Sequence, residues 1–329
     1  MNRLLAIEQY GLGDAVLSVP VLEALRRRWP QAELATLAGG GALALRQAFP
    51  CSFRVLSAPP QAEPWDAVLD LTGKLRTARL ARRLAAAVVV GTPWWALRWG
   101  AGRCYTRVVS PEPGRHAVEH RLAMLAALGI EVGSAPPRLA AAGEDREWAR
   151  EWLEAHRLPG PLVALHPGGR SRGRSWGAPA YGELVGRLAP EGMVCLLVGE
   201  GRERAMLEGI ASRMPGQALV AADLPLGRLA ALLEQCRGFV GGDSGPLHLA
   251  CALGVPVVAL FGRSDPAWCG PYSDLARVIT LGWPCSPCRR WPHERWRPCL
   301  RRYGCVRRIP VDRVAEALLQ AVSPGVCLA

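Results

Sequence analysis

Short apolar runs alternate along the chain with segments in which apolar residues recur every three or four positions. The first such unit is an apolar run at residues 3–8, the glycine turn YGLGD and a helical stretch at residues 16–30. Buried parallel strands are continuously apolar and amphipathic helices repeat near 3.6 residues, so this unit opens a doubly wound α/β domain. The pattern continues with predicted strands at residues 33–39, 65–71 and 88–91 and predicted helices at residues 75–86 and 116–130.

A proline-rich stretch interrupts this alternation. We interpret SAPPRL, residues 134–139, as a linker, and a charged helix is expected next at residues 144–158. The alternation then restarts, with predicted strands at residues 161–169, 193–199, 217–221, 236–242 and 255–262. A chain of 329 residues exceeds the size at which single cores stop growing, so two Rossmann-like α/β domains are predicted. We place them at residues 1–140 and 141–310, with a C-terminal helix in residues 311–329.

The composition is that of a soluble folded protein. Half of the residues are apolar, 21% are charged, and no apolar run reaches the roughly 18 residues that a membrane-spanning helix needs. The opening residues MNRLLAIEQYG become polar too early for a signal peptide. We therefore expect a cytoplasmic location.

Arginine dominates the charge of the chain. The formal net charge is +12, and Lys74 is the single lysine. Such a bias looks compositional, yet a surface this basic attracts phosphates, anionic lipid or nucleic acid. Eight arginines crowd into residues 289–308, within a Cys/Arg-rich segment at residues 283–308 for which irregular structure is expected.

The eleven cysteines, without a secretion signal, are expected to be reduced thiols. Four stand singly in apolar surroundings and are predicted to lie in the core: Cys51, Cys195, Cys236 and Cys251. Four others have the spacing C-x2-C-x10-C-x5-C, at Cys285, Cys288, Cys299 and Cys305. This spacing permits a structural metal site, for zinc rather than an iron–sulfur cluster, and reduced thiols or disulfides are the alternatives. His116 and His120, one helical turn apart, are expected on a solvated helix face.

The stretch GGDSGPLHLACALGVPVVALFG, residues 241–262, places a polar turn between an apolar strand and a helix. Ligands of open parallel sheets bind beyond the carboxyl ends of strands, where helix N-termini present unpaired N–H groups. Gly245 lets the backbone approach a phosphate, Ser244 can donate a hydrogen bond, and His248 faces the turn from one helical turn further on. The pattern favours a phosphate or sugar-nucleotide site, and simple helix capping by Asp243 and Ser244 is the alternative.

Two more strand ends carry polar turns in the second half. HPGGRSRGRSW, residues 166–176, contains three glycines and three arginines, which suit a diphosphate because guanidinium groups bind phosphate oxygens bidentately. LLVGEGRERAML places Glu200 and Glu203 near the same edge, where a carboxylate would accept hydrogen bonds from ribose hydroxyls. Solvated helix charge is the alternative for these two residues.

The glycine turn of the first half, YGLGD, offers Gly11, Gly13 and Asp14. It is not a complete dinucleotide fingerprint, so nicotinamide-cofactor binding is weakly supported. An acid at such a turn would instead deprotonate an acceptor hydroxyl, and capping of the following helix is the competing interpretation.

Taken together, these stretches resemble a known family. GLGDAVLSVPVLEALRRRWP, WDAVLDLTGKLRTARLARRL, HPGG followed by RSW, VGEGRERA and GGDSGPLHLACALGVPVVALFG look like the ADP-heptose:lipopolysaccharide heptosyltransferases, glycosyltransferase family 9, in the same order. The resemblance spans nearly the whole chain, and the last stretch is the most specific. It implies a GT-B architecture, in which two Rossmann-like domains have parallel sheets that face a cleft.

For the reaction, the resemblance implies transfer of heptose from ADP-heptose to the lipopolysaccharide inner core, either Kdo-lipid A or a core heptose. The transfer would invert the anomeric carbon and need no metal cofactor. Asp14 falls on the family's general base and Glu203 on its nucleotide-binding acid. Arg174 stands where the family has a phosphate-contacting lysine, and we expect it to keep the cationic role.

The remaining donor contacts implied by the resemblance come from two turns. Asp243, Ser244, Gly245 and His248 fall on the turn for the donor sugar and diphosphate. Some members carry two small hydroxyl residues after the strand that ends in histidine, where this chain has Gly168 and Gly169. Backbone N–H groups are therefore expected to replace those side-chain contacts.

On the acceptor side we expect contacts from Gly13, Asp70, Gly73, Lys74 and Arg76, the last four in a DLxGxxRS-like stretch of the family. A cationic loop suits phosphorylated lipid A or its acidic sugars. Trp94, Trp95 and Trp99, interleaved with Arg98 and Arg103, would rest on the cytoplasmic face of the inner membrane as a peripheral contact, and packing in the core is the slightly favoured alternative.

Two other functions stay open at this point. Another sugar-nucleotide enzyme of the same architecture, such as a UDP-sugar 2-epimerase, would carry similar turns. A nucleic-acid-binding protein would use the Cys/Arg-rich segment as a zinc module, with affinity that falls steeply with salt. Two α/β domains are unnecessary for such a module, so no nucleic-acid partner is expected.

Overall fold

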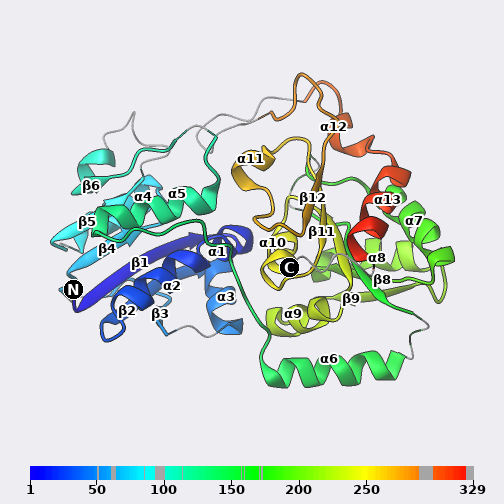
Figure 1. The fold of residues 1–329 in the computed structure, drawn as a ribbon, viewed down its shortest axis with the longest axis horizontal. Helices are drawn as coiled ribbons and strands as arrows, with labels where there is room; N and C mark the ends of the chain where they lie inside the picture. The colour runs from blue at the N-terminus through cyan, green and yellow to red at the C-terminus, as the bar shows by residue number, and fades with distance from the viewer. Residues whose placement is uncertain are drawn as a thin grey trace. The chain divides into compact units, whose positions relative to one another are not determined.

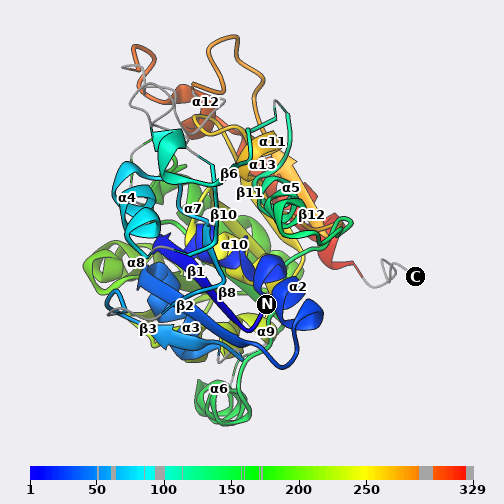
Figure 2. The same ribbon diagram turned by 90° about the vertical axis from the view of Figure 1, so that its left-hand side faces the viewer.

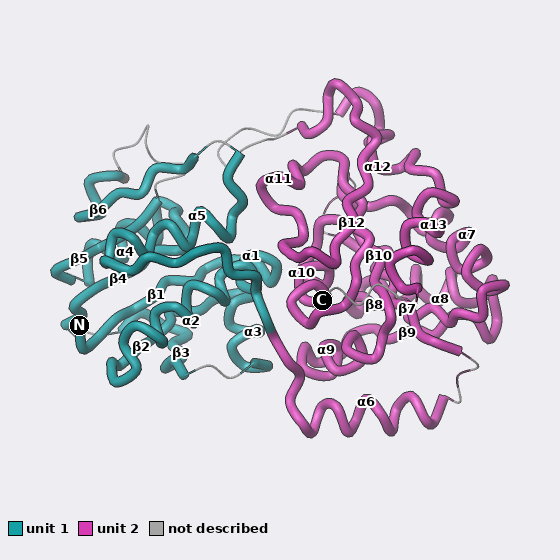
Figure 3. The backbone as a smooth tube through the Cα atoms, viewed as in Figure 1, with its two compact units in different colours: residues 1–138, 291–294 teal, residues 139–290, 295–329 magenta. Residues whose placement is uncertain are grey.

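The computed structural model in Figure 1 describes residues 1–49, 52–60, 64–84, 86–92, 101–112, 114–156, 158, 160–169, 171, 173–288 and 299–323. These residues fall into two compact units, coloured separately in Figure 3. Unit 1 holds the described residues up to Arg138, and unit 2 holds those from Leu139 onward, including the C-terminal helix. The division lies two residues before the boundary placed at residue 140 from the sequence.

Unit 1 is built on a parallel sheet of six strands in the order β3-β2-β1-β4-β5-β6. The strands are β1 (Arg3–Tyr10), β2 (Glu33–Gly40), β3 (Arg54–Leu56), β4 (Ala67–Asp70), β5 (Val88–Gly91) and β6 (Arg107–Val108). The helices are α1 (Leu12–Val16), α2 (Val19–Arg28), α3 (Gly41–Ala48), α4 (Leu75–Arg83) and α5 (Ala117–Ala123), with 3-10 turns η2 (Ala101–Cys104) and η3 (Met124–Leu128). The direction of strand order reverses between β1 and β4, which pair with each other. Open sheets bind ligands at the carboxyl edge of such a reversal.

The predicted helix over residues 16–30 corresponds to α2, and a separate short helix, α1, comes before it. α1 ends at Val16, and α2 begins at Val19 with Pro20 in its first turn. Proline has no N–H to continue the ladder of a preceding helix but fits the first turn of a new one, so the chain restarts there. The break leaves α1 as a five-residue turn of helix that carries Asp14.

The prediction that His116 and His120 lie on a solvated helix face is wrong. His116 is buried and caps α5, where its Nδ1 accepts a hydrogen bond from the backbone N–H of Val118 at 3.2 Å. His120 is 2% exposed, and its Nε2 lies 3.0 Å from Thr92 Oγ1 beyond the end of β5. Burial lowers the pKa of His120 to about 3, with help from the nearby Arg121 and Arg115.

Unit 2 repeats the same plan with the strand order β12-β11-β10-β7-β8-β9, again all parallel. Its strands are β7 (Leu162–His166), β8 (Val194–Gly199), β9 (Ala218–Ala222), β10 (Gly238–Gly242), β11 (Val257–Leu260) and β12 (Ala276–Ile279). Its helices are α6 (Gly143–His156), α7 (Ala178–Leu188), α8 (Arg204–Ala211), α9 (Leu226–Glu234), α10 (Gly245–Ala252), α11 (Pro266–Cys269), α12 (Gly304–Arg307) and α13 (Val311–Val322), with 3-10 turns η4 (Ala189–Glu191) and η5 (Gly201–Glu203). Here the order reverses between β7 and β10.

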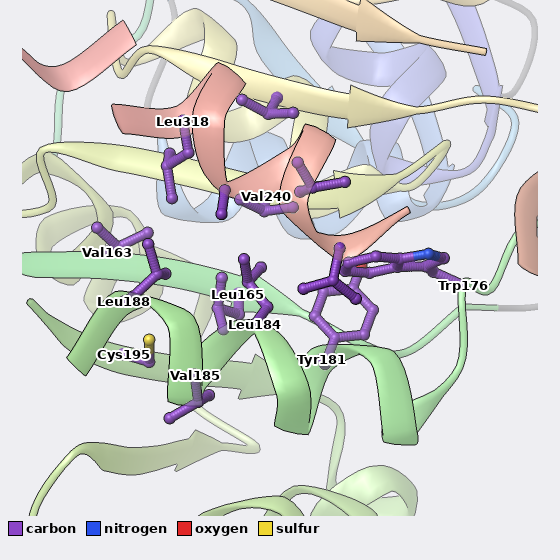
Figure 4. Packing of buried hydrophobic residues seen from close by; sticks show 14 of the residues in the cluster. Val163, Leu165, Trp176, Tyr181, Leu184, Val185, Leu188, Cys195, Val240 and Leu318 are labelled. Atoms are coloured by element: carbon purple, nitrogen blue, oxygen red, sulfur yellow. The ribbon is translucent and has the colours of Figure 1, made fainter. Parts of the chain in front are cut away.

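Helices α7 and α13 cover one face of the unit 2 sheet, as Figure 4 shows. Apolar side chains of the two helices pack against those of β7 and β10. The strands contribute Val163, Leu165 and Val240, and the helices contribute Tyr181, Leu184, Leu188 and Leu318. Trp176 meets Tyr181 edge-on at 5.1 Å, and its Nε1 donates a hydrogen bond to the carbonyl of Ile309 at 2.9 Å. This anchor fixes the end of the turn that follows β7.

Three of the four cysteines predicted to lie in the core, Cys195, Cys236 and Cys251, are buried, whereas Cys51 lies outside the described residues. Burial raises the pKa of the Cys195 thiol to about 12, so it stays protonated. The charged helix α6 lies along α9 in both views (Figure 1, Figure 2). None of the helices in the described ranges combines the length and the apolar character that crossing a bilayer requires.

Candidate functional site

The carboxyl edge of unit 1 presents Asp14 where the strand order reverses. Gly11 and Gly13 lead from β1 into α1, and the Asp14 side chain is 56% exposed. Its Oδ1 lies 2.6 Å from Nη2 of Arg121, a residue of α5 whose own side chain is 10% exposed. The structure thus places an accessible carboxylate at this edge and holds it with a largely buried cation.

A buried polar network lies beneath this carboxylate. Glu8, in the middle of the apolar strand β1, is fully buried and pairs with Arg46 at 3.0 Å. Glu8 also accepts hydrogen bonds from Thr36 Oγ1 and from Tyr10 Oη, at 2.7 and 3.1 Å. Burial, together with the Glu8 charge, raises the pKa of Tyr10 well above its ordinary value, so the phenol stays protonated. Tyr10 therefore acts as a fixed hydrogen-bonding group.

The neighbouring turn after β4 is shaped by Asp70. Its carboxylate is 1% exposed and accepts hydrogen bonds from the backbone N–H groups of Thr72 and Gly73, at 3.0 and 3.1 Å. Tyr105 Oη donates a third bond at 2.8 Å. Burial raises the pKa of Asp70 despite these bonds. Asp70 supports the turn, so the structure corrects the expectation that this carboxylate itself faces an acceptor.

The turn built by Asp70 carries the other residues predicted for the acceptor side. Gly73 adopts φ +64°, a left-handed conformation that favours glycine. Lys74 and Arg76 follow it and are exposed at the beginning of α4. Because β1 and β4 are adjacent and parallel, Gly13, Asp14, Lys74 and Arg76 share one edge of the sheet. Trp94, Trp95, Arg98 and Trp99 lie outside the described residues, and Arg103 is exposed in η2.

In unit 2, the two turns at the reversal meet through Asp243. Its Oδ2 lies 3.1 Å from Nε of Arg174, in the turn after β7, and its Oδ1 lies 4.0 Å from Nε2 of the buried His248. A side chain at Gly242 would meet the carbonyl oxygen of Arg174 at 2.2 Å, so only glycine lets the two turns approach this closely. The structure brings together Arg174, Asp243, Ser244, Gly245 and His248, and their role in donor binding stays a prediction.

Helix capping does not account for Ser244. It stands at the N-cap of α10, yet its hydroxyl makes no capping bond to the helix. The buried Oγ has no hydrogen-bond partner within the described part of the chain. A buried hydroxyl without a partner at the N-terminus of a helix is a group that a bound anion would satisfy.

The Glu203 side chain, from the turn after β8, is hydrogen-bonded to the turn after β7. It accepts hydrogen bonds from the backbone N–H groups of Gly169 and Glu200, at 3.0 and 2.9 Å. A Cβ on Gly168 would lie 2.2 Å from its Oε1, which explains the glycine there. Glu203 is mostly buried, unlike the solvated Glu200. The Gly169 N–H, expected to face a diphosphate, is occupied by Glu203 in this structure.

Sequence reasoning missed His166 and Arg121. His166 ends β7, with its Nε2 3.9 Å from Glu203 Oε2 and its buried Nδ1 without a hydrogen-bond partner among the described residues. Burial lowers the pKa of His166 against the opposing attraction of Glu203. The signal for His166 is a polar residue at a strand end, whereas nothing local marks Arg121 as the partner of Asp14.

The four-cysteine group lies in unit 2. Cys305, on α12, packs against the backbone of Gly262, and Cys299 Sγ accepts a hydrogen bond from the backbone N–H of Tyr303 at 3.1 Å. Burial and the neighbouring thiols Cys288, Cys299 and Cys285 raise the pKa of Cys305. All four are free thiols. Across the described ranges, no three His, Cys, Asp or Glu side chains are arranged to hold a metal ion, so the structural zinc site stays a prediction that metal analysis would test.

Comparison with known proteins supplies the family. Residues 61–301 match the model for glycosyltransferase family 9 (heptosyltransferase). The chain belongs to glycosyltransferase family 9. It is 31% identical over 226 residues to lipopolysaccharide heptosyltransferase 1 of Pseudomonas aeruginosa, an alignment that covers 68% of this chain and 62% of that protein. It is 23% identical over 286 residues to lipopolysaccharide heptosyltransferase 3 of Escherichia coli, covering 80% of this chain and 84% of that protein.

Solved structures of family 9 enzymes share the fold. The structure of E. coli ADP-heptose LPS heptosyltransferase II superimposes with a TM-score of 0.76 at 21% identity, covering 97% of this chain and 98% of that one. The family 9 match confirms the resemblance noted from the motifs, the α/β class with two parallel sheets and the assignment as a glycosyltransferase. The alternatives, a UDP-sugar 2-epimerase or a nucleic-acid-binding protein, are not favoured.

Proposed function

We propose that this family 9 chain transfers a heptose from ADP-heptose to a sugar of the lipopolysaccharide inner core, either Kdo-lipid A or a core heptose, with inversion at the anomeric carbon. The observation that carries the proposal is the group at the carboxyl edge of unit 2. There Arg174 and His248 flank Asp243, beside the buried Ser244 hydroxyl, which has no hydrogen-bond partner among the described residues. A cation, a free hydroxyl and a helix N-terminus at one strand-order reversal suit a nucleoside diphosphate sugar.

The donor diphosphate is held by this group. Asp243 engages Nε of Arg174, and the terminal amino groups of the guanidinium remain to bind phosphate oxygens bidentately. Ser244 Oγ and the first backbone N–H groups of α10 add neutral donors. When the bond between the anomeric carbon and the phosphate oxygen breaks, these donors and Arg174 stabilise the negative charge on the departing ADP.

The acceptor is activated by Asp14. Its carboxylate takes the proton of the acceptor hydroxyl while the hydroxyl oxygen forms the new bond to the anomeric carbon. The nucleophile arrives opposite the departing ADP, so the anomeric configuration inverts. The exposed Lys74 and Arg76 share the edge of Asp14 and provide positive charge for the phosphates or acidic sugars of the acceptor.

The proposal extends to location. An acceptor linked to lipid A lies in a membrane, and a chain with a net charge of +12 is attracted to an anionic lipid surface. We therefore propose that the protein works in the cytoplasm, in peripheral contact with the inner membrane. Flotation with anionic vesicles at low and high salt tests this part.

Incubation of the purified protein with ADP-heptose and Kdo-lipid A, followed by mass spectrometry of both products, tests the reaction. We expect ADP and an acceptor heavier by one heptose. Binding of ADP without any transfer would refute this donor and acceptor pair, and absence of ADP binding would refute the donor site itself. Conversion of a UDP-sugar to its epimer would favour the epimerase alternative.

A further inference from the structure

Arg121 stands out among the charged residues of unit 1 because it is nearly buried and yet reaches an exposed partner. Its side chain is 10% exposed, while the Asp14 side chain that it binds at 2.6 Å is 56% exposed. Burial of a guanidinium is unfavourable unless the group is well paired. An exposed ion pair contributes little to stability, so stability alone does not explain why Arg121 is buried against Asp14.

One tyrosine holds both this arginine and the backbone of Asp14. The Arg121 Cζ lies over the Tyr10 ring at 5.5 Å from its centroid. Tyr10 Oη lies 2.5 Å from Ser18 Oγ, and Ser18 Oγ donates to the carbonyl oxygen of Asp14 at 2.9 Å. Asp14 is thus fixed at two points, its side chain by Arg121 and its backbone by Ser18.

The local chain cannot fix Asp14 alone. α1 has five residues, its N-cap is Gly11, and no side chain caps it. Glycine at residues 11 and 13 adds backbone freedom on the N-terminal side of Asp14. A general base must lie within a few tenths of an ångström of its working position, so rigidity has to come from elsewhere in the unit.

We infer that Arg121 is a positioning residue for Asp14, an inference that rests on the proposed function of Asp14 as the base. Arg121 binds Oδ1 and fixes the rotamer of the carboxylate, which leaves Oδ2 to take the proton of the acceptor hydroxyl. Tyr10 supports the same pair, because its ring packs against Arg121 and its hydroxyl contacts Ser18, which binds the backbone of Asp14. Arg121 itself takes no proton and forms no bond in the reaction.

The second amino group of the Arg121 guanidinium indicates that the residue does more than stabilise the fold. Nη1 of Arg121 is buried and has no hydrogen-bond partner among the residues that the structure describes. Buried donors that serve only to hold a fold are almost always satisfied. An unsatisfied donor needs another explanation, and a place beside a reacting group is one such explanation.

The test compares Arg121→Ala, Arg121→Lys and the control Arg82→Ala, an exposed arginine of α4 in the same unit. We expect Arg121→Ala to lower kcat roughly 10- to 100-fold while KM for ADP-heptose and Kd for ADP stay unchanged, because the donor site is in unit 2. Arg121→Lys should recover part of kcat. Millimolar guanidinium chloride should also restore part of the activity of Arg121→Ala and none of Asp14→Asn.

Tyr10→Phe covers the case in which the alanine variant does not fold. It removes the hydroxyl that contacts Ser18 and donates to Glu8, keeps the ring against Arg121, and should lower kcat without changing KM for the donor. Wild-type kcat in Arg121→Ala, or a loss that neither lysine nor guanidinium restores, would overturn the inference while the proposed function stands. Absence of transfer by the wild-type protein would overturn the proposed function and the inference with it. The wild-type measurement therefore distinguishes this outcome from a failure of the inference about Arg121.

Discussion

Asp243 and Arg174 join the two turns at the strand-order reversal of unit 2, with Oδ2 of one 3.1 Å from Nε of the other. The two residues are distant in sequence and come from different strand ends, β10 and β7. Their pairing joins the two polar turns and holds the guanidinium near the beginning of α10, where we propose that the donor diphosphate binds.

Replacement of Arg174 should weaken donor binding. Arg174→Ala removes the cation that pairs with the nearly buried Asp243, so the Kd for ADP is expected to rise roughly 10- to 100-fold, the effect of losing a charged hydrogen bond. Titration calorimetry with ADP measures it. Arg187→Ala, which breaks an exposed ion pair between α7 and Asp312 of α13 in the same unit, is the control and should leave Kd unchanged. Equal affinities in both variants would refute the role of Arg174.

Replacement of Gly242 should separate the two turns. A Cβ at Gly242 would lie 2.2 Å from the carbonyl oxygen of Arg174, which belongs to the backbone and cannot swing away. We expect Gly242→Ala to lower the free energy of unfolding by about 1–3 kcal/mol and to weaken ADP binding. Gly182→Ala on α7, where nothing lies within 4 Å of the new methyl group, should be neutral or slightly stabilising. Urea unfolding that shows no difference between these variants would contradict the packing described.

The limits of sequence reasoning are visible at particular residues. The buried strands and the turn after β10 could be predicted, because continuous apolar runs and a glycine–serine turn are local signals. The Asp14–Arg121 pair could not, because 107 residues separate its members and Arg121 looks like any other arginine of an amphipathic helix. The buried His120 is hydrogen-bonded to Thr92 at a distant strand end, a contact that no local pattern of the helix indicates. Glu8 did carry a signal, since a charge inside an apolar strand requires a buried partner.

The buried His120 should make unit 1 sensitive to acid. Its pKa is about 3 in the folded chain and about 6.5 in an unfolded one, so between these values the unfolded state binds more protons. The neutral ring therefore supports folding fully above about pH 6.5, and that support falls by at most about 1.4 kcal/mol for each pH unit below it. Urea unfolding at pH 7 and pH 5 should show a larger loss of stability for the wild type than for His120→Gln, by roughly 2 kcal/mol. Equal losses would contradict the assignment.

The proposed role of Asp14 is to deprotonate a hydroxyl of the lipopolysaccharide core for attack on ADP-heptose. The most direct test measures acceptor-dependent ADP release and acceptor mass for the wild type and Asp14→Asn, with Kd for ADP determined on the same samples. Glu112→Gln, an exposed carboxylate of unit 1, is the control. We expect an acceptor heavier by one heptose with the wild type and the control, and a rate lower by roughly 10²- to 10⁴-fold in Asp14→Asn at unchanged Kd. Transfer at the wild-type rate by Asp14→Asn, or no acceptor-dependent release by the wild type, would contradict it.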